Sequence, residues 1–283
     1  MHLDPETASA ELQGIAYRSP YLFGRENSRW RLEDFQRVVD WLSAVSLSGI
    51  YQLLKRLQVS YKRGRMSLHS PDPEYNKKLA VIRNAKAECA AHPGKVVFLY
   101  EDEHTFGRYP TVASAYAGTG IAEQTAEQYA GYNCLRRIAG CLDISTGAFI
   151  SRQRNHFTAD QMGKFYQFVE DQYPDAEIIY IALDNWKVHF EPSILEAMEK
   201  RKSRIRLLRL PTYAPWTNPT EKVWRLFKQE VTHMHPYTYE WKTLRQTIDG
   251  WFEARRAPSQ ELLYTVGLLE DSYEKASMLH NRL

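Results

Sequence analysis

The spacing of apolar residues predicts a pair of short helices near the start of the chain. Between Trp30 and Leu57, apolar residues recur every three or four positions, which is the helical period. A break at Val45–Gly49 separates the two helices and offers Ser46 or Ser48 as the N-cap of the second one. Helices joined by so short a turn cross steeply, so the pattern predicts a helix-turn-helix.

After residue 93 the pattern changes to short apolar strands that alternate with helices. Strands are expected at 96–101, 134–142, 147–152, 178–183 and 205–210, and helices at 158–172, 192–202 and 219–232. The order βββαβαβα joins an antiparallel meander to alternating α and β units, which predicts an α/β fold with one mixed sheet and helices on both faces.

The same pattern suggests how the chain is divided. We expect a helix-turn-helix region at 1–73 that ends in a linker at 69–73, a connecting helix within 74–95, and the α/β domain at 96–283 with a helical tail.

Composition excludes several classes of protein. The 283 residues are 43% hydrophobic and 25% charged, which is ordinary for a folded soluble protein and argues against long disorder or a fibre. The longest apolar runs, Val96–Tyr100 and Ile178–Leu183, are far shorter than the roughly 20 residues of a membrane span. The first residues are acidic where a secretory signal is basic, so we expect a cytoplasmic protein. Three cysteines without a C-x-x-C spacing are expected to be reduced thiols.

Positive charge is concentrated near the start of the chain. Residues 1–95 contain 15 Lys and Arg against 10 Asp and Glu, whereas the remainder contains 22 against 24. On the second predicted helix, Gln52, Lys55 and Arg56 lie away from the apolar stripe and are candidates for the major groove of DNA. A basic arm follows, with Lys62, Arg63 and Arg65. A small helical bundle with a solvated charged face is the alternative.

Three acidic residues stand where predicted elements begin or end. Asp102 follows the first strand, Asp184 follows the fourth, and Glu221 opens a late helix. If the first and fourth strands are neighbours, both aspartates emerge at one edge of the sheet, and the late helix can bring Glu221 over them. Carboxylates held together repel one another, and hard cations such as Mg²⁺ relieve the repulsion. Two such ions about 3.5–4 Å apart would suit cleavage or transfer of a phosphodiester.

Each acid, taken alone, also has a purely structural explanation. Glu221 completes an N-P-T-E capping box, Asp184 could cap a turn, and Asp102 with Glu103 could be a solvated pair. Three nearby tryptophans, at 186, 216 and 224, could stack on an unpaired base or pack into the core. The combination of the three acids, in this order and among these neighbours, favours a site.

Three segments carry a resemblance to a known family. YEDEHTF at 100–106, LDNWKVH at 183–189 and LPTYAPWTNPTEKVW at 210–224 resemble the catalytic blocks of DDE transposases of the mariner superfamily, in the bacterial insertion-sequence branch. The resemblance extends over about 96–231, and the helix-turn-helix resembles that family's second such unit. It implies a ribonuclease-H-like fold in which Asp102, Asp184 and Glu221 bind two Mg²⁺ ions, with Mn²⁺ as a substitute.

Other residues match the same motifs. His189 completes a D-N-x-x-x-H pattern, so it could donate to a phosphate or to water in the site, or it could be a histidine satisfied within the fold. Asn218 belongs to the N-P-x-E pattern and is expected to position Glu221.

The resemblance implies a bacterial, nucleoid-associated transposase that cuts transposon ends and joins the 3′ hydroxyl to target DNA at TA dinucleotides, as a dimer on DNA. Only some 30 residues precede the helix-turn-helix, whereas the family usually has two such units. We therefore expect weakened recognition of the ends, a second polypeptide that completes it, or a truncated or domesticated copy. The alternatives are a nuclease of the same fold that cuts without joining, and a DNA-binding regulator without catalysis.

Overall fold

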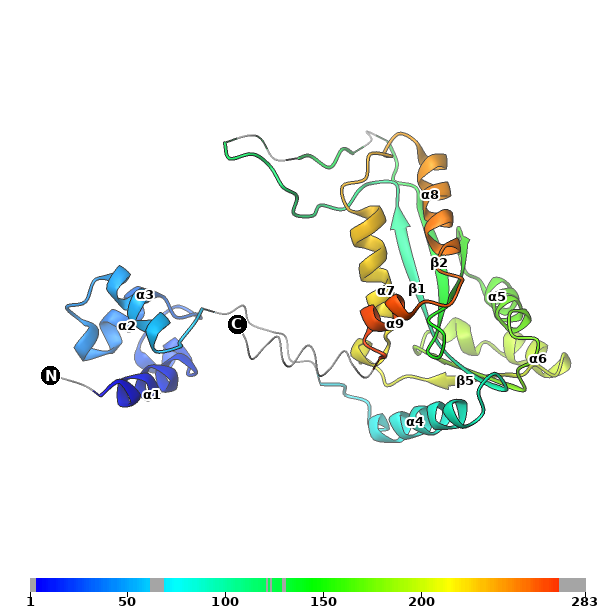
Figure 1. Cartoon of the computed structure of the whole chain (residues 1–283), viewed down its shortest axis with the longest axis horizontal. Helices are drawn as coiled ribbons and strands as arrows, with labels where there is room; N and C mark the ends of the chain where they lie inside the picture. Colours follow the sequence, from blue (N-terminus) through cyan, green and yellow to red (C-terminus); the bar gives the residue numbers. More distant parts are fainter. Residues whose placement is uncertain (1–3, 62–68, 121, 123, 129–130, 270–283) are drawn as a thin grey trace. The chain divides into compact units, whose positions relative to one another are not determined.

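The structure, a computed structural model, describes residues 4–61, 69–120, 122, 124–128 and 131–269 (Figure 1). The chain divides into two compact units, Met1–Ser67 and Leu68–Leu283. The predicted basic arm of Lys62, Arg63 and Arg65 lies outside the described residues. Within the described ranges, no helix is both long enough and apolar enough to cross a membrane.

The N-terminal unit contains the predicted helix pair. Its helices are α1 (Pro5–Ala16), α2 (Leu32–Val38) and α3 (Leu47–Arg56), with short 3₁₀ turns at Pro20–Phe23 and Asp40–Leu42. Ser46 is the N-cap of α3, and its hydroxyl accepts a hydrogen bond from the Gly49 N–H at 3.2 Å. The three helices share one core, formed by Leu12, Phe35, Val39, Leu42, Ile50 and Leu54. The helix pair is therefore confirmed, and α1 completes the same core.

The C-terminal unit is built on the predicted mixed sheet of five strands. They are β1 (Val96–Gly107), β2 (Leu135–Asp143), β3 (Phe149–Arg154), β4 (Ile178–Leu183) and β5 (Ile205–Arg209), in the order β3-β2-β1-β4-β5. The central strand, β1, pairs antiparallel with β2 and parallel with β4. The expectation that the first and fourth strands are adjacent in the sheet is thereby confirmed.

Helices cover both faces of the sheet (Figure 1). One face carries α5 (Ala159–Asp171) and α6 (Pro192–Lys200); the other carries α4 (Tyr75–Ala91), α7 (Thr220–Phe227), α8 (Trp241–Glu253) and α9 (Gln260–Val266). Side chains alternate along β1, so Val97 and Leu99 pack in the core under α5 and α6, whereas Phe98 and Tyr100 pack against α4. Short 3₁₀ turns lie at Lys187–Phe190 and Pro215–Thr217.

Two elements near the candidate acids end at different residues than predicted. The first strand continues to Gly107 instead of ending at Glu101, because β2 supplies hydrogen-bonding partners as far as Leu135 opposite Gly107. Asp102 therefore lies inside the strand and not after it. The late helix α7 ends at Phe227, and a π-helical turn continues to Thr232.

The segment 69–73, predicted as a linker, is fastened to the C-terminal unit. Ser70 donates to the Thr212 carbonyl at 2.5 Å, and the Thr212 N–H donates to Asp72 at 2.8 Å. Lys78 on α4 forms an ion pair with the same Asp72 carboxylate at 2.7 Å. These tertiary contacts make the segment part of the second unit.

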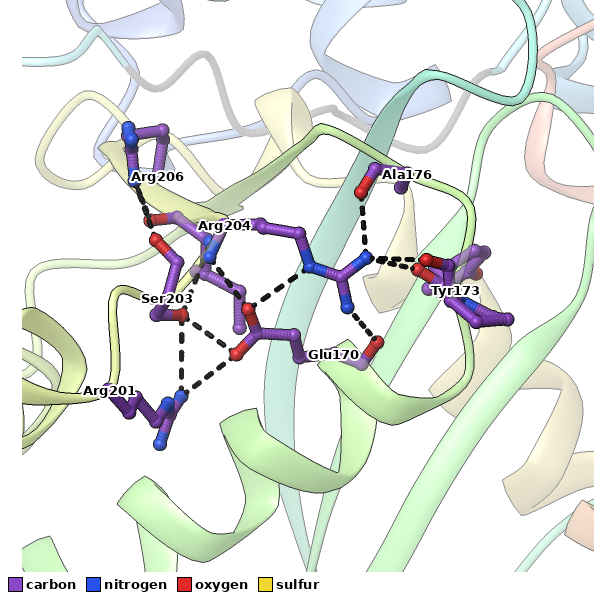
Figure 2. A network of polar contacts seen from close by, with 9 residues as sticks. Glu170, Tyr173, Ala176, Arg201, Ser203, Arg204 and Arg206 are labelled. Carbon is purple, nitrogen blue, oxygen red and sulfur yellow. Dashed lines mark hydrogen bonds and ion pairs between the residues drawn. The ribbon is translucent and has the colours of Figure 1, made fainter.

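A network of polar contacts fixes the start of β5 against the end of α5 (Figure 2). The Arg204 guanidinium donates to the carbonyls of Tyr173, Pro174 and Ala176 and to the Glu170 carbonyl. The Glu170 carboxylate in turn accepts from the Arg204 N–H at 2.6 Å and from the Ser203 hydroxyl at 2.8 Å. These bonds give hydrogen-bond donors to the backbone carbonyls of the loop at 173–176, for which the sequence pattern indicates no partner.

Candidate active site

The register of the parallel strands brings two of the candidate acids together. Tyr100 on β1 lies opposite Ala182 on β4, and two residues further along each chain stand Asp102 and Asp184. Parallel strands point the same way, so both aspartates lie at one edge of the sheet, where open α/β sheets commonly bind ligands.

The third acid, Glu221, is brought to this edge by the start of α7. Asn218 donates from its side-chain amide to the Glu101 carbonyl at 2.9 Å, and the Thr220 hydroxyl donates to the Tyr100 carbonyl at 3.2 Å. Both anchoring side chains are buried, so the first turn of α7 is fixed on the backbone of β1 beside Asp102.

The capping alternative for Glu221 is not supported. Asn218 Oδ1 accepts from the Thr220 N–H at 3.1 Å, but the Asn218 N–H donates to the Pro215 carbonyl at 3.0 Å and not to Glu221, so the Glu221 half of the capping box is missing. Glu221 is exposed, and within the described residues its carboxylate makes no hydrogen bond. Its side chain is therefore free to bind a ligand.

Asp102 is the most constrained member of the group. The indole N–H of Trp224 on α7 donates to Asp102 Oδ2 at 2.9 Å. Burial, together with the negative charges of Glu221 and Asp184, raises the pKa of Asp102 to about 7. Gly140 lies directly opposite Asp102 on β2, and a Cβ there would meet the Phe149 ring at 2.3 Å and Trp224 at 3.0 Å. Glycine is therefore needed for the indole to reach the carboxylate.

Asp184 combines a structural contact with an accessible side chain. Its Oδ1 accepts from the Trp186 N–H at 2.7 Å, so the expected turn cap is present. The neighbouring His189 imidazole and this N–H together lower the pKa of Asp184. The side chain remains 57% exposed, however, so capping the turn does not use up its capacity to bind a ligand. Asn185 fixes the same loop by donating to the Leu210 carbonyl at 2.9 Å.

His189 is beside the acids but has no exposed surface. Its Nδ1 lies 2.7 Å from the Tyr166 hydroxyl, within hydrogen-bond distance, and its side chain is 0% exposed. Direct donation to a DNA phosphate, one of the roles considered from the sequence, does not fit this burial. The other expectation, a histidine satisfied within the fold, fits only Nδ1, because Nε2 has no hydrogen-bond partner in the described part of the chain.

Glu101 and Glu103 form a feature that sequence reasoning missed. They alternate with Asp102 on β1 and therefore point to the opposite face of the sheet. The Glu101 side chain is 0% exposed and that of Glu103 is 17% exposed. Burial and the neighbouring carboxylates raise the pKa of both well above the ordinary range. The available signal was the run of three consecutive acids, Glu101 to Glu103, whose side chains point to alternating faces only if the strand continues past Glu101.

The candidate DNA-binding side chains lie on one face of α3. Gln52, Lys55 and Arg56 are exposed, whereas Ile50 and Leu54 face the core. This arrangement agrees with the helical spacing and suits either groove binding or a solvated face.

The tryptophans near the acids divide into two kinds. Trp224 is 2% exposed and Trp186 packs against the core, so both contribute to the packing of the fold. Trp216 is 49% exposed and donates to the Tyr75 hydroxyl at 3.2 Å, so among these three it is the one that an unpaired base could reach.

The chemistry of the three acids fits a hard divalent cation. Within the described part of the chain, none of Asp102, Asp184 and Glu221 forms an ion pair with lysine or arginine. Carboxylate oxygens are preferred Mg²⁺ ligands, and a cation would relieve the repulsion that raises the pKa of Asp102.

Comparison with known proteins gives concordant results. Residues 97–245 match the family described as DDE superfamily endonuclease. The insertion element IS630 uncharacterized 39 kDa protein of Shigella sonnei is 25% identical over 238 residues, covering 83% of this chain and 67% of that protein.

Two solved structures have the same fold. The Mos1 transposase paired-end complex with left transposon end matches with a TM-score of 0.62 at 15% identity, covering 94% of this chain and 76% of that one. The Mos1 mariner paired end complex with Mg matches with a TM-score of 0.63 at 12% identity, covering 97% and 77%. The ribonuclease-H-like fold and the resemblance inferred from the sequence are thereby confirmed.

Proposed function

This chain belongs to the DDE superfamily endonucleases, and on that premise we propose that it is a DNA transposase. It cuts DNA at transposon ends to expose a 3′ hydroxyl, and that hydroxyl then attacks a phosphodiester of the target DNA. The second step forms one phosphodiester bond and breaks another, so it needs no further energy source.

One observation carries the proposal more than any other. Asp102, Asp184 and Glu221 come from three separate segments and are held at one edge of the sheet, yet Glu221 has no structural duty that would explain its place.

The enzyme is metal-dependent, and we assign its metal ligands to Asp102, Asp184 and Glu221. We propose two ions in each site, Mg²⁺ or its substitute Mn²⁺. When bound, they supply Lewis-acid stabilisation of the negative charge that develops on the phosphate oxygens. One of the two similar Mos1 structures is a complex with Mg, which supports this choice.

The chain's own residues position the carboxylates for this chemistry. Trp224 orients Asp102 through the indole N–H, Asn218 and Thr220 hold the turn that carries Glu221, and Asn185 holds the loop that carries Asp184. Because these anchors are preformed, the carboxylates need little reorganisation when ligands arrive.

We propose that double-stranded DNA is the partner of both units. The exposed face of α3 contacts one transposon end, and the C-terminal unit cuts it. The similar Mos1 structure is a paired-end complex with the left transposon end, which supports the pairing of two ends. We further propose that a homodimer pairs them and inserts at TA sites of nucleoid DNA. A second polypeptide that contributes to recognition of the ends also belongs to this proposal.

One assay separates the possible activities. The full chain is incubated with Mg²⁺ or Mn²⁺ and a library of DNA fragments with candidate ends, and both cut ends and new junctions are sequenced. The proposal expects metal-dependent cuts and junctions at target sites. Cuts without junctions would indicate a nuclease, and the absence of cutting with retained DNA binding would indicate a regulator.

A further inference from the structure

A second group of acids lies behind the candidate active site. Glu101 and Glu103 on β1 and His189 on the turn after β4 each offer one ligand atom, and these atoms all lie within 4.8 Å of one another. Among the described residues, these three are the group of possible ligands that lie this close together. The carboxylates of Asp102, Asp184 and Glu221, the candidate triad, do not all lie within this limit of one another.

The second cluster is separate from the triad because it lies on the other face of the sheet. Asp102 points toward Trp224 on α7, whereas Glu101 and Glu103 point the opposite way. His189 contacts Tyr166 of α5, which packs on that opposite face. Asp184, at the end of β4, is the residue that borders both groups.

The cluster is buried and its polar atoms are unsatisfied. Glu101 and His189 are both 0% exposed. Within the described chain, both carboxylate oxygens of Glu101, Oε1 of Glu103 and Nε2 of His189 have no hydrogen-bond partner. Leaving such groups buried without partners destabilises the fold, and more so when they are charged.

The distances within the cluster suit a shared cation better than hydrogen bonds. His189 Nε2 lies 3.6 Å from Glu101 Oε2, 3.5 Å from Glu103 Oε1 and 3.5 Å from Asp184 Oδ1. Hydrogen bonds from nitrogen to oxygen are shorter, about 2.7–3.2 Å. Around a tetrahedral ion with bonds of about 2.0–2.2 Å, neighbouring ligand atoms are about 3.3–3.6 Å apart.

We propose that Glu101, Glu103 and His189 bind a divalent first-row transition-metal ion. Asp184 Oδ1, which lies 3.5 Å from His189 Nε2, stands next to the fourth coordination position. A donor set that includes imidazole favours such ions over Mg²⁺, which prefers oxygen ligands alone. Tyr166 serves as the outer hydrogen-bond partner of the His189 ring and fixes its orientation, as is usual for histidine ligands.

This ion has a structural purpose at the edge of the active site. It neutralises two carboxylates buried in the core beneath α5 and fixes the loop that carries Asp184. The site is therefore a support for the triad and not one of its ions. Its existence does not depend on the proposed transposase activity.

The test uses Co²⁺ and Mn²⁺ with the full chain carrying Asp102→Asn and Glu221→Gln, which weaken the triad site. Calorimetry with Co²⁺ measures stoichiometry, and pulsed electron paramagnetic resonance with Mn²⁺ detects coupling to a histidine nitrogen. We expect one ion per chain and a histidine nitrogen signal. This measurement needs no change in the proposed site, so it does not depend on whether a site variant folds.

Matched variants then assign the nitrogen. Adding His189→Gln should weaken Co²⁺ binding at least tenfold and remove the nitrogen signal. His235→Gln should change neither, although His235 is also a buried histidine whose Nε2 lacks a partner in the described structure. Glu103→Gln gives a second test, with weaker binding expected. Absence of binding, binding without a nitrogen signal, or full binding by the His189 variant would overturn the proposal.

Discussion

Asp102 occupies the most unfavourable electrostatic position of the three candidate ligands. It is largely buried, and the charges of Glu221 and Asp184 oppose its ionisation, so its pKa is raised to about 7. An aspartate in the unfolded chain has a pKa near 3.8. The metal-free fold therefore binds a proton that the unfolded chain releases, and the free energy of unfolding should fall as pH rises between these values.

Replacing Asp102 with asparagine should remove this cost. In metal-free protein, Asp102→Asn should raise the free energy of unfolding relative to wild type by up to about 4 kcal/mol at pH 8. The difference should shrink as pH falls from 7 toward 4, where wild-type Asp102 is protonated. Denaturant unfolding in the presence of a chelator measures it. The exposed Asp175→Asn removes one charge outside the cluster and serves as control; equal effects of the two variants would contradict the pKa assignment.

At this scale the sequence predicted the triad but not the residues around it. The three acids could be proposed from the sequence because their flanking motifs are local. Trp224 as the partner of Asp102, and Glu101 and Glu103 on the other face, depend on side-chain direction in a strand whose polar half resembled a loop. Gly140, which makes room for Trp224, carries no signal in its own segment.

At the scale of elements, the periodicity predicted the order of helices and strands, while their ends were set by tertiary contacts. The end of β1 depends on pairing with β2, which is more than 25 residues away in the sequence. The linker at 69–73 is likewise held by Thr212, more than a hundred residues away. No local pattern contains either contact.

The polar network at the start of β5 is the clearest element-scale test of stability (Figure 2). Arg204→Lys keeps the charge but loses the planar fork that reaches several carbonyls at once, so the free energy of unfolding should fall by about 2–3 kcal/mol. Arg206→Lys is the matched control, because among the described residues that side chain donates only to the nearby carbonyls of Ser203 and Ile205. Its replacement should cost less than about 1 kcal/mol. Urea denaturation compares them, and equal losses would contradict the role of the network.

For the whole molecule, the charge distribution agrees with a division of labour between the two units. Residues 1–67 contain 10 Lys and Arg against 7 Asp and Glu, whereas residues 68–283 contain 27 against 27, and the acidic cluster lies in this C-terminal unit. An acidic site repels DNA when its metal ions are absent, so binding by the N-terminal unit would raise the local concentration of substrate.

The face of α3 should therefore make a measurable contribution to DNA binding. Lys55→Ala with Arg56→Ala should weaken duplex binding by the full chain and lower the slope of log K against log salt by about one for each phosphate that the helix no longer binds. Fluorescence anisotropy at several salt concentrations gives both values. Lys164→Ala with Lys200→Ala removes the same charge from α5 and α6 and should leave the slope unchanged. An unchanged slope for the α3 variant would show that this helix does not bind DNA.

The most direct measurement is cleavage of supercoiled plasmid or candidate transposon ends in Mg²⁺ or Mn²⁺ by wild type, Asp102→Asn, Asp184→Asn and Glu221→Gln. Each variant loses one anionic ligand and should cut at least about 100-fold more slowly while still binding DNA. The exposed Glu196→Gln on α6, the matched charge control, should cut like wild type. Wild-type cutting by one triad variant would remove that residue from the site, and wild-type cutting by all three would contradict the assignment of this site as the catalytic centre.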